Sequence, residues 1–145
     1  MPSNYLTGND LVSNDGIDLD DTYITDAWLV DGYVGESLFA FGFNIKGQLG
    51  DGTVINKSSP VQVGSLTNWK QVAAGGDHTA SIKTDGTLWT CGYNLYGQLG
   101  DGTIVNKSSP VQVGSLTNWK QVAGGFYHTA AVLSPEVNSY SIVGM

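Results

Sequence analysis

Two histidines stand in equivalent positions fifty residues apart, and they are the first side chains in this sequence that could do chemistry. Imidazole is a common metal ligand and a general base near neutral pH. The residues beside them do not repeat, because Asp77 precedes His78 whereas Tyr127 precedes His128. A shared metal site would need matching further ligands. We therefore interpret both histidines as structural, and the sequence predicts no metal ligand.

Acidic side chains gather in two kinds of stretch. Asn14 to Asp21 crowds oxygen ligands around an early glycine and faintly resembles a calcium loop. Its order is wrong for a helix-loop-helix site and no bidentate glutamate follows at the right distance, so we interpret it as a solvated loop. Asp51-Gly52-Thr53 recurs as Asp101-Gly102-Thr103. These aspartates are predicted to be turn residues that accept hydrogen bonds from the backbone, not acid/base catalysts.

The remaining candidates are aromatic residues and one thiol. Trp69, Trp89 and Trp119 could line a sugar-binding groove, but aromatics placed once per repeat are more typical of a core. Cys91 is the single cysteine and is predicted to be a small buried hydrophobe. No nucleophile triad order, phosphate-binding loop, paired metal cysteines or dinucleotide fingerprint occurs. The sequence therefore predicts a protein without catalytic residues or cofactor, and not an enzyme.

Most of these residues lie in a tandem duplication with a period of 50 residues. The stretch from Gly47 to Ala73 returns from Gly97 to Ala123 with only two exchanges, each of one β-branched aliphatic residue for another. A repeat of this length is typical of solenoids, propellers and arrays. The two copies must therefore pack in the same way.

Each unit is predicted to supply four short antiparallel strands. Apolar runs ended by glycine suit strands buried on both faces, and a proline inside a strand suits a sheet edge. Asp85-Gly86 is a strong hairpin signal. No stretch has helical periodicity, so the predicted fold class is all-β. The expected strands are 38–42, 59–63, 69–73, 78–83 and 88–92, and then 119–123 and 128–133.

The repeat divides the chain into four segments. Residues 38–87 form the first unit, 88–137 the second, and 138–145 a C-terminal strand or tail. Two readings of residues 1–37 stay open. One is a degenerate third unit, because Trp28 to Tyr33 falls over His78 to Lys83 after a shift of one period. The other is an irregular arm containing one strand.

The charge balance excludes several partners. Six basic residues, all lysine, face 13 acidic residues, and the net charge is −7. Nucleic acids and anionic membrane surfaces are therefore not expected as partners. Eight of the acids precede Lys46, so the N-terminal quarter is either a solvated face or an acidic arm that meets a basic surface on a protein partner.

The ordered motifs resemble one known family. LWTCGYNLYGQLGDGT, SSPVQV, WKQVAAGGDHT and ASIKTDGTLW are similar to the regulator of chromosome condensation repeat, a family of seven-bladed β-propellers, over residues 38–133. The resemblance implies blades of four antiparallel strands. It also implies roles in holding blades together, not in catalysis, for Gly42, Gly47, Gly50, Gly92, Gly97, Gly100, Trp69, Trp119, His78 and His128.

Two clear units, with a degenerate third, cannot close a ring alone, because propellers have about four to eight blades. Exposed edge strands would then pair with other copies, so we expect a homo-oligomer. The expected function is that of a non-enzymatic structural or interaction protein, such as a phage or viral capsid decoration or tail-associated protein. The alternative is a soluble module that binds a protein or glycan through its loops. No secretory signal or transmembrane run is recognised, so a virion or cytoplasmic location is expected.

Overall fold

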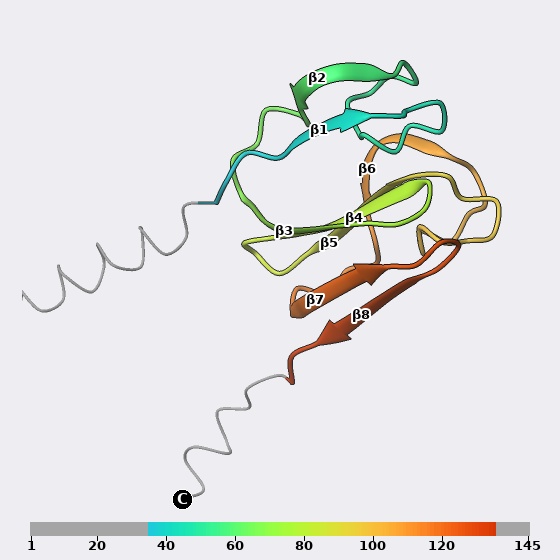
Figure 1. The fold of residues 1–145 in the computed structure, drawn as a ribbon. Helices are drawn as coiled ribbons and strands as arrows, with labels where there is room; N and C mark the ends of the chain where they lie inside the picture. Colours follow the sequence, from blue (N-terminus) through green and yellow to red (C-terminus); the bar gives the residue numbers. More distant parts are fainter. Residues whose placement is uncertain (1–34, 136–145) are drawn as a thin grey trace, which may run out of the picture. The chain divides into compact units, whose positions relative to one another are not determined.

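A computed structural model of the chain describes residues 35–135. The predicted acidic stretch 14–21, nearly all of the segment 1–37 and the tail 138–145 lie outside the described residues. The described part is built of strands joined by turns and loops, without a helix, so the all-β prediction is confirmed. Figure 1 shows three successive sheets along the chain.

The strands follow the repeat. They are β1 Phe39–Gly42, β2 Lys57–Gln62, β3 Trp69–Ala74, β4 His78–Lys83, β5 Leu88–Gly92, β6 Lys107–Gln112, β7 Trp119–Gly124 and β8 Thr129–Leu133. Sequence predicted the bounds of β4 and β5, whereas β2 begins two residues earlier than expected. Pro60 and Pro110 lie in β2 and β6, which end their sheets, as the missing N–H donor requires.

The sheets are out of phase with the sequence units. One complete antiparallel sheet has the order β3-β4-β5-β6, flanked by the pairs β1-β2 and β7-β8. Each predicted unit, 38–87 and 88–137, thus contributes two strands to the complete sheet. As a division into domains, those boundaries stay a prediction. What the strand pairing adds is that residues 69–112 form the four-stranded blade.

The turn between β4 and β5 forms as the sequence predicts. Gly86 has φ +82°, a conformation that costs glycine little. Asp85 accepts hydrogen bonds from the N–H and the hydroxyl of Thr87, at 3.0 and 2.6 Å. The turn sets β4 and β5 in register, with Ile82 opposite Leu88.

The core lies between the complete sheet and the β7-β8 pair. Ile82, Leu88 and Val122 are buried together with Ala80, and Trp119 packs against them. Because β7 contacts both β3 and β4, the sheets stack along the chain. β5 is buried as predicted, but β1 is half-exposed or exposed along its length, because within residues 35–135 it pairs with β2 alone.

Candidate functional site

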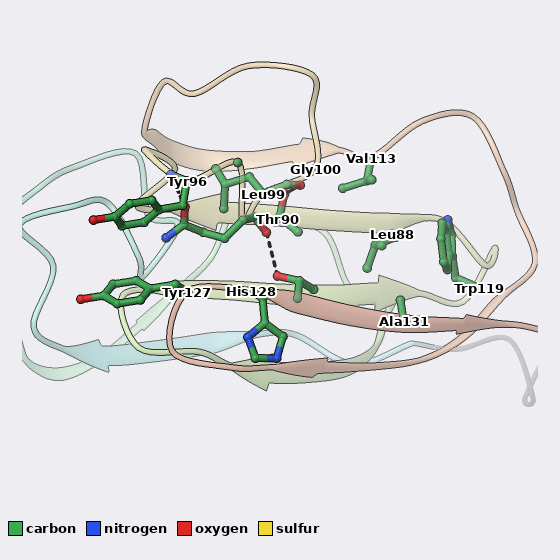
Figure 2. A pocket seen from close by; sticks show the side chains of 13 residues that line it. Leu88, Thr90, Tyr96, Leu99, Gly100, Val113, Trp119, Tyr127, His128 and Ala131 are labelled. Atoms are coloured by element: carbon green, nitrogen blue, oxygen red, sulfur yellow. Dashed lines mark hydrogen bonds between the residues drawn. The ribbon is translucent and has the colours of Figure 1, made fainter.

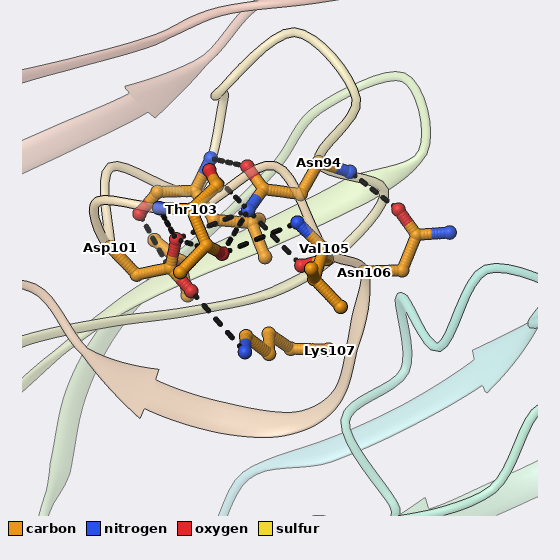
Figure 3. Close-up of polar contacts among 8 residues, drawn as sticks. Asn94, Asp101, Thr103, Val105, Asn106 and Lys107 are labelled. Atoms are coloured by element: carbon orange, nitrogen blue, oxygen red, sulfur yellow. Dashed lines mark hydrogen bonds and ion pairs between the residues drawn. The ribbon is translucent and has the colours of Figure 1, made fainter.

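The glycine-rich loop after β5 is organised by one buried asparagine (Figure 3). Asn94 is fully buried, and its Nδ2 donates to Oδ1 of Asp101 and to the carbonyls of Thr103 and Val105, all at 3.0–3.1 Å. Its Oδ1 accepts from the N–H of Leu99 at 2.9 Å. The side chain therefore replaces the regular backbone pairing that a loop lacks.

Asp101 ties the same loop to the next strand. It accepts from the N–H and the hydroxyl of Thr103, at 2.9 and 2.8 Å, and its Oδ2 lies 3.8 Å from Nζ of Lys107. Burial acts to raise the pKa of Asp101, but the hydrogen bonds from Thr103 and Asn94 outweigh it and leave the pKa below its usual value. A carboxylate held ionised in this way positions a loop.

The first repeat builds the same network. Asn44 is fully buried and donates to Asp51, Thr53 and Ile55, and Asp51 lies 3.4 Å from Lys57. The prediction that Asp51 and Asp101 accept hydrogen bonds within turns is confirmed. Asn44 and Asn94 were missed as organisers, although in both repeats an asparagine stands three residues before the Gly-Gln-Leu-Gly-Asp-Gly-Thr motif.

The two histidines differ in environment. Nε2 of His78 lies 2.8 Å from Oγ1 of Thr129, so the side chain joins β4 to the β7-β8 pair. His78 is buried, whereas His128 is exposed. Burial lowers the pKa of His78, the charge of His128 adds to the shift, and Asp77 partly opposes it. The structure does not bring the two histidines together with further ligands, and no cluster of three metal-binding side chains occurs within residues 35–135.

Two more contacts join the complete sheet to the β7-β8 pair. The N–H of Val122 donates to Oε1 of Gln71 at 3.0 Å, and the N–H of Gly76 donates to the carbonyl of Gly125 at 3.1 Å. We call these two contacts and the His78–Thr129 contact the sheet junction. It joins residues about fifty positions apart, so it is the contact that one repeat makes with the next.

Beside β8 the structure has a cavity of about 310 Å³ (Figure 2). Leu88, Leu99 and Trp119 supply its apolar wall, and Thr90 and Thr129 are among its polar residues. Nε2 of Gln98, which also lines it, is buried without a hydrogen-bond partner in the described part of the chain. In the first repeat, Nε2 of Gln48 donates to Asp77 at 3.2 Å, and Tyr127 stands at the matching position.

Exposed aromatic rings stand at one end of this cavity. Tyr96 and Tyr127 lie 4.9 Å apart between ring centroids, and Phe126 and Tyr93 extend the group. We call these four residues the aromatic cluster. The first repeat has Phe43, Lys46, Gly76 and Asp77 at the matching positions. The two repeats thus differ at all four of these positions, and the second one presents aromatic rings there.

The tryptophans are packing residues with one unusual neighbour. Trp69 is 6% exposed, and Trp119 packs against the core. Nζ of Lys83 lies 3.7 Å from the ring centroid of Trp89 and 5.0 Å from that of Trp69. Burial lowers the pKa of Lys83, partly opposed by Asp85. These three residues line a second cavity of about 260 Å³, so the structure brings together two of the three tryptophans named as groove candidates. The part played by Lys83 was not foreseen, because the matching residue of the second unit is Leu133.

Cys91 lies in β5 with 3% of its surface exposed, as predicted for a small core residue. Burial raises the pKa of its thiol to about 12, and the charge of Asp51 adds to the shift. In the part of the chain that the structure covers, no helix is long and apolar enough to cross a membrane.

One four-stranded antiparallel sheet, flanked by two antiparallel strand pairs and stacked with them along a 50-residue repeat, defines this chain as a β-propeller repeat protein. The sequence profile of the Regulator of chromosome condensation (RCC1) repeat matches residues 36–82 and 85–132, and a second profile of the same repeat matches residues 69–98. The chain therefore belongs to the RCC1 repeat family. No curated protein matches its sequence significantly.

Two solved structures share the fold. Human WBSCR16 is 23% identical, with a TM-score of 0.58, over 68% of this chain and 27% of that chain. Prp20p from Saccharomyces cerevisiae, described with its binding properties to Gsp1p and histones, is 16% identical, with a TM-score of 0.54, over 74% of this chain and 30% of that chain. The chain thus spans less than a third of either neighbour.

Proposed function

We propose that this chain is a non-enzymatic structural and interaction protein that oligomerises through its propeller repeats. The observation that carries the proposal is a pair of complementary faces. Val122 is 6% exposed at the sheet junction, whereas Val72, one repeat earlier, is 51% exposed. His78 is buried by the next repeat, whereas His128 is exposed. The face of β3 and β4 that carries Val72 at one end of the stack is therefore complementary to the face of β7 and β8 that carries His128 at the other end.

Self-association follows from the same chemistry. Gln121 and His128 are exposed side chains of the types that Gln71 and His78 use at the sheet junction. Val72 and Thr79 carry the backbone N–H and the hydroxyl that match those of Val122 and Thr129. A face-to-back contact of this kind is heterologous and closes into a ring when the rotation permits. The RCC1-repeat fold is that of a protein-interaction module, and Prp20p itself is described as binding proteins.

Size-exclusion chromatography with light scattering tests this proposal. The expected result is a mass that rises with concentration to a defined multiple of one chain. A single chain at every concentration up to the millimolar range would contradict self-association. His128→Ala should weaken the assembly by about tenfold, the effect of one lost buried contact. Lys120→Ala, an exposed change on the neighbouring strand, serves as the matched control.

The setting we propose is a virion, with the chain as a capsid decoration or tail-associated protein. Near-identical tandem repeats, the absence of arginine and the net charge of −7 support this setting. In the same proposal, the acidic N-terminal residues meet a basic surface on a protein partner. Mass spectrometry of purified particles, compared with the particle-free supernatant, should find the chain enriched with the particles. Deleting residues 1–30 should release it from them without changing self-association.

A recognition module that binds a protein or glycan through its loops is the second candidate. The aromatic cluster favours it, because Tyr96 is 66% exposed, Phe126 65% and Tyr127 51%. Exposed aromatic groups of this size mark binding surfaces. The first repeat supplies a matched variant, Tyr96→Lys with Tyr127→Asp, which should abolish binding on a glycan or protein array without unfolding. Retained binding by this variant would contradict a role for the cluster.

A further inference from the structure

We propose that β8 of one chain pairs with β1 of a second copy, so that β7, β8 and the second copy's β1 and β2 form one four-stranded intermolecular sheet. This inference rests on the proposed function and names the joint through which the chains assemble. Its order would be the same as that of the complete sheet β3-β4-β5-β6.

The first step is that each end of the described region holds half of a sheet. β7 and β8 match β3 and β4 in sequence, and β2 is identical to β6. Within the described residues, β8 pairs with β7 alone and β1 with β2 alone. The missing half at one end is therefore the half present at the other. Unpaired edges of this kind are the usual site of strand addition.

The second step is the register. In the complete sheet, Ala80 lies opposite Thr90 and Ser81 opposite Trp89. A shift of one repeat places Ala130 opposite the second copy's Ala40, and Ala131 opposite the second copy's Phe39. Both β8 residues are alanine, so the large side chain of the second copy's Phe39 meets a small one. Phe39 and Phe41 are 53% and 63% exposed and would be covered by the pairing.

The third step is the space for the incoming strands. The cavity of about 310 Å³ beside β8 is lined by Thr129 and Ala131 together with Leu99 and Gly100 of the preceding loop. A cavity of about 260 Å³ beside β1 is lined by Phe39, Phe41, Val72 and Thr79, among others. The first cavity receives side chains of the second copy's β1, and the second receives β7 and β8 of a neighbouring copy.

The fourth step is the contact between the glycine-rich loop after β1 and the outer strand β6 of the next sheet. The N–H of Gly52 donates to the carbonyl of Ser108 at 2.8 Å, and Gly47 lies so close to Ser108 in β6 that a Cβ would meet its Cα at 2.6 Å. The matching glycines, Gly97 and Gly102, have open space at their Cβ positions. The second loop therefore has an empty place where the first loop holds Ser108, and the second copy's β2 carries the matching Ser58.

A second copy fits this place better than the chain's own strands. The described region holds the sequence pattern of strand, glycine-rich loop and proline-bearing strand twice, as β1-β2 and as β5-β6. β5 and β6 already belong to the complete sheet. β1 and β2 lie on the far side of that sheet from β7 and β8 (Figure 1). The intermolecular sheet gives each chain the equivalent of two blades, so rings of about two to four chains reach the four to eight blades of propellers.

Disulfide cross-linking between two differently tagged full-length variants tests the pairing. Ala130→Cys mixed with Ala40→Cys should form a mixed disulfide under mild oxidation, because directly opposite residues in antiparallel strands lie within disulfide range. Ala130→Cys mixed with Phe39→Cys should not, because Phe39 faces the opposite side of the strand. Cys91 is buried and does not compete. Circular dichroism shows whether each variant is folded.

A second measurement needs no cross-link. Gly97→Asn should weaken self-association by about tenfold or more, because the added side chain meets the second copy's β2. Gly114→Asn is the matched control, since Gly64, its partner in the first repeat, has open space although the next sheet is present. Both positions have positive φ, at +79° and +65°, which asparagine tolerates.

The outcomes separate the two proposals. Self-association without the Ala130→Cys to Ala40→Cys disulfide would support oligomerisation and overturn the intermolecular sheet. A single chain at every concentration would overturn both. The chain's own residues 23–33 are the competing occupant of the β1 edge, and a disulfide within one chain of the Val30→Cys, Ala40→Cys double variant would identify them and overturn the inference.

Discussion

Nε2 of His78 lies 2.8 Å from Oγ1 of Thr129, and the two residues stand 51 positions apart in the sequence. The contact crosses from one sheet to the next at one period of the repeat. It therefore reports how repeats join, and its unfilled counterpart at His128 reports where the next one would bind.

The His78 side chain makes stability depend on pH. Its pKa is lowered in the folded state, chiefly by burial, so protonation favours the unfolded chain. The stabilisation that neutral His78 gives to the folded state is complete above the unfolded pKa of about 6.5, and it is lost as the pH falls below that value. Urea unfolding between pH 7.5 and 5 should show this loss. His78→Gln should remove that part of the pH dependence, and an unchanged profile would contradict it.

Asn94→Ala should destabilise the fold by about 2–4 kcal/mol. The change removes the donor and acceptor that hold the loop, and it leaves the buried N–H of Leu99 and the partly buried carbonyls of Thr103 and Val105 without this partner. Denaturant unfolding measures the loss. Ser115→Ala, an exposed change in the same repeat, should alter the free energy of unfolding by less than about 0.5 kcal/mol.

Ile82→Ala should cost about 2–5 kcal/mol, the range for truncating a buried aliphatic side chain. Ile82 is 1% exposed and central to the core, whereas Val54 is 55% exposed in a loop. Val54→Ala should therefore change the free energy of unfolding little. Equal losses at both positions would place the core elsewhere.

Tyr127→Asp should be more stable than Tyr127→Ala by about 1 kcal/mol. Both variants lose the ring, but only aspartate offers Nε2 of Gln98 the acceptor that Asp77 gives Gln48. Thermal unfolding of the two variants, compared directly, isolates this contact. Equal stability would show that Gln98 is satisfied in another way.

The Cys91 thiol should not react with a water-soluble disulfide reagent while the protein is folded. Its pKa is raised to about 12, so almost no thiolate is present near pH 8. Absorbance of the released thiolate should rise only on addition of denaturant. Rapid labelling in native buffer would show that β5 opens locally.

Much of the fold was readable because its determinants are local and repeated. The glycine-ended apolar runs predicted β5, and Asp85-Gly86 predicted its hairpin, since turn conformation and strand alternation depend on neighbouring residues. The roles of Asp51 and Asp101 in turns followed for the same reason. The duplication of Gly47 to Ala73 predicted one packing solution for both copies, and this holds for the loop networks of Asn44 and Asn94 but not for the burial of Val72 and Val122.

Tertiary structure alone decided which strands share a sheet and which copies of a residue are buried. The sequence unit begins near Leu38, but the complete sheet begins at Trp69, because strand pairing depends on contacts between units. Val72 and Val122 have the same neighbours in sequence, and only the presence of a preceding sheet buries one of them. Whether a residue is buried depends on the neighbouring sheet as much as on the residue itself. The sequence therefore determined the strands, and the stacking of the sheets decided which strand faces stay exposed for binding.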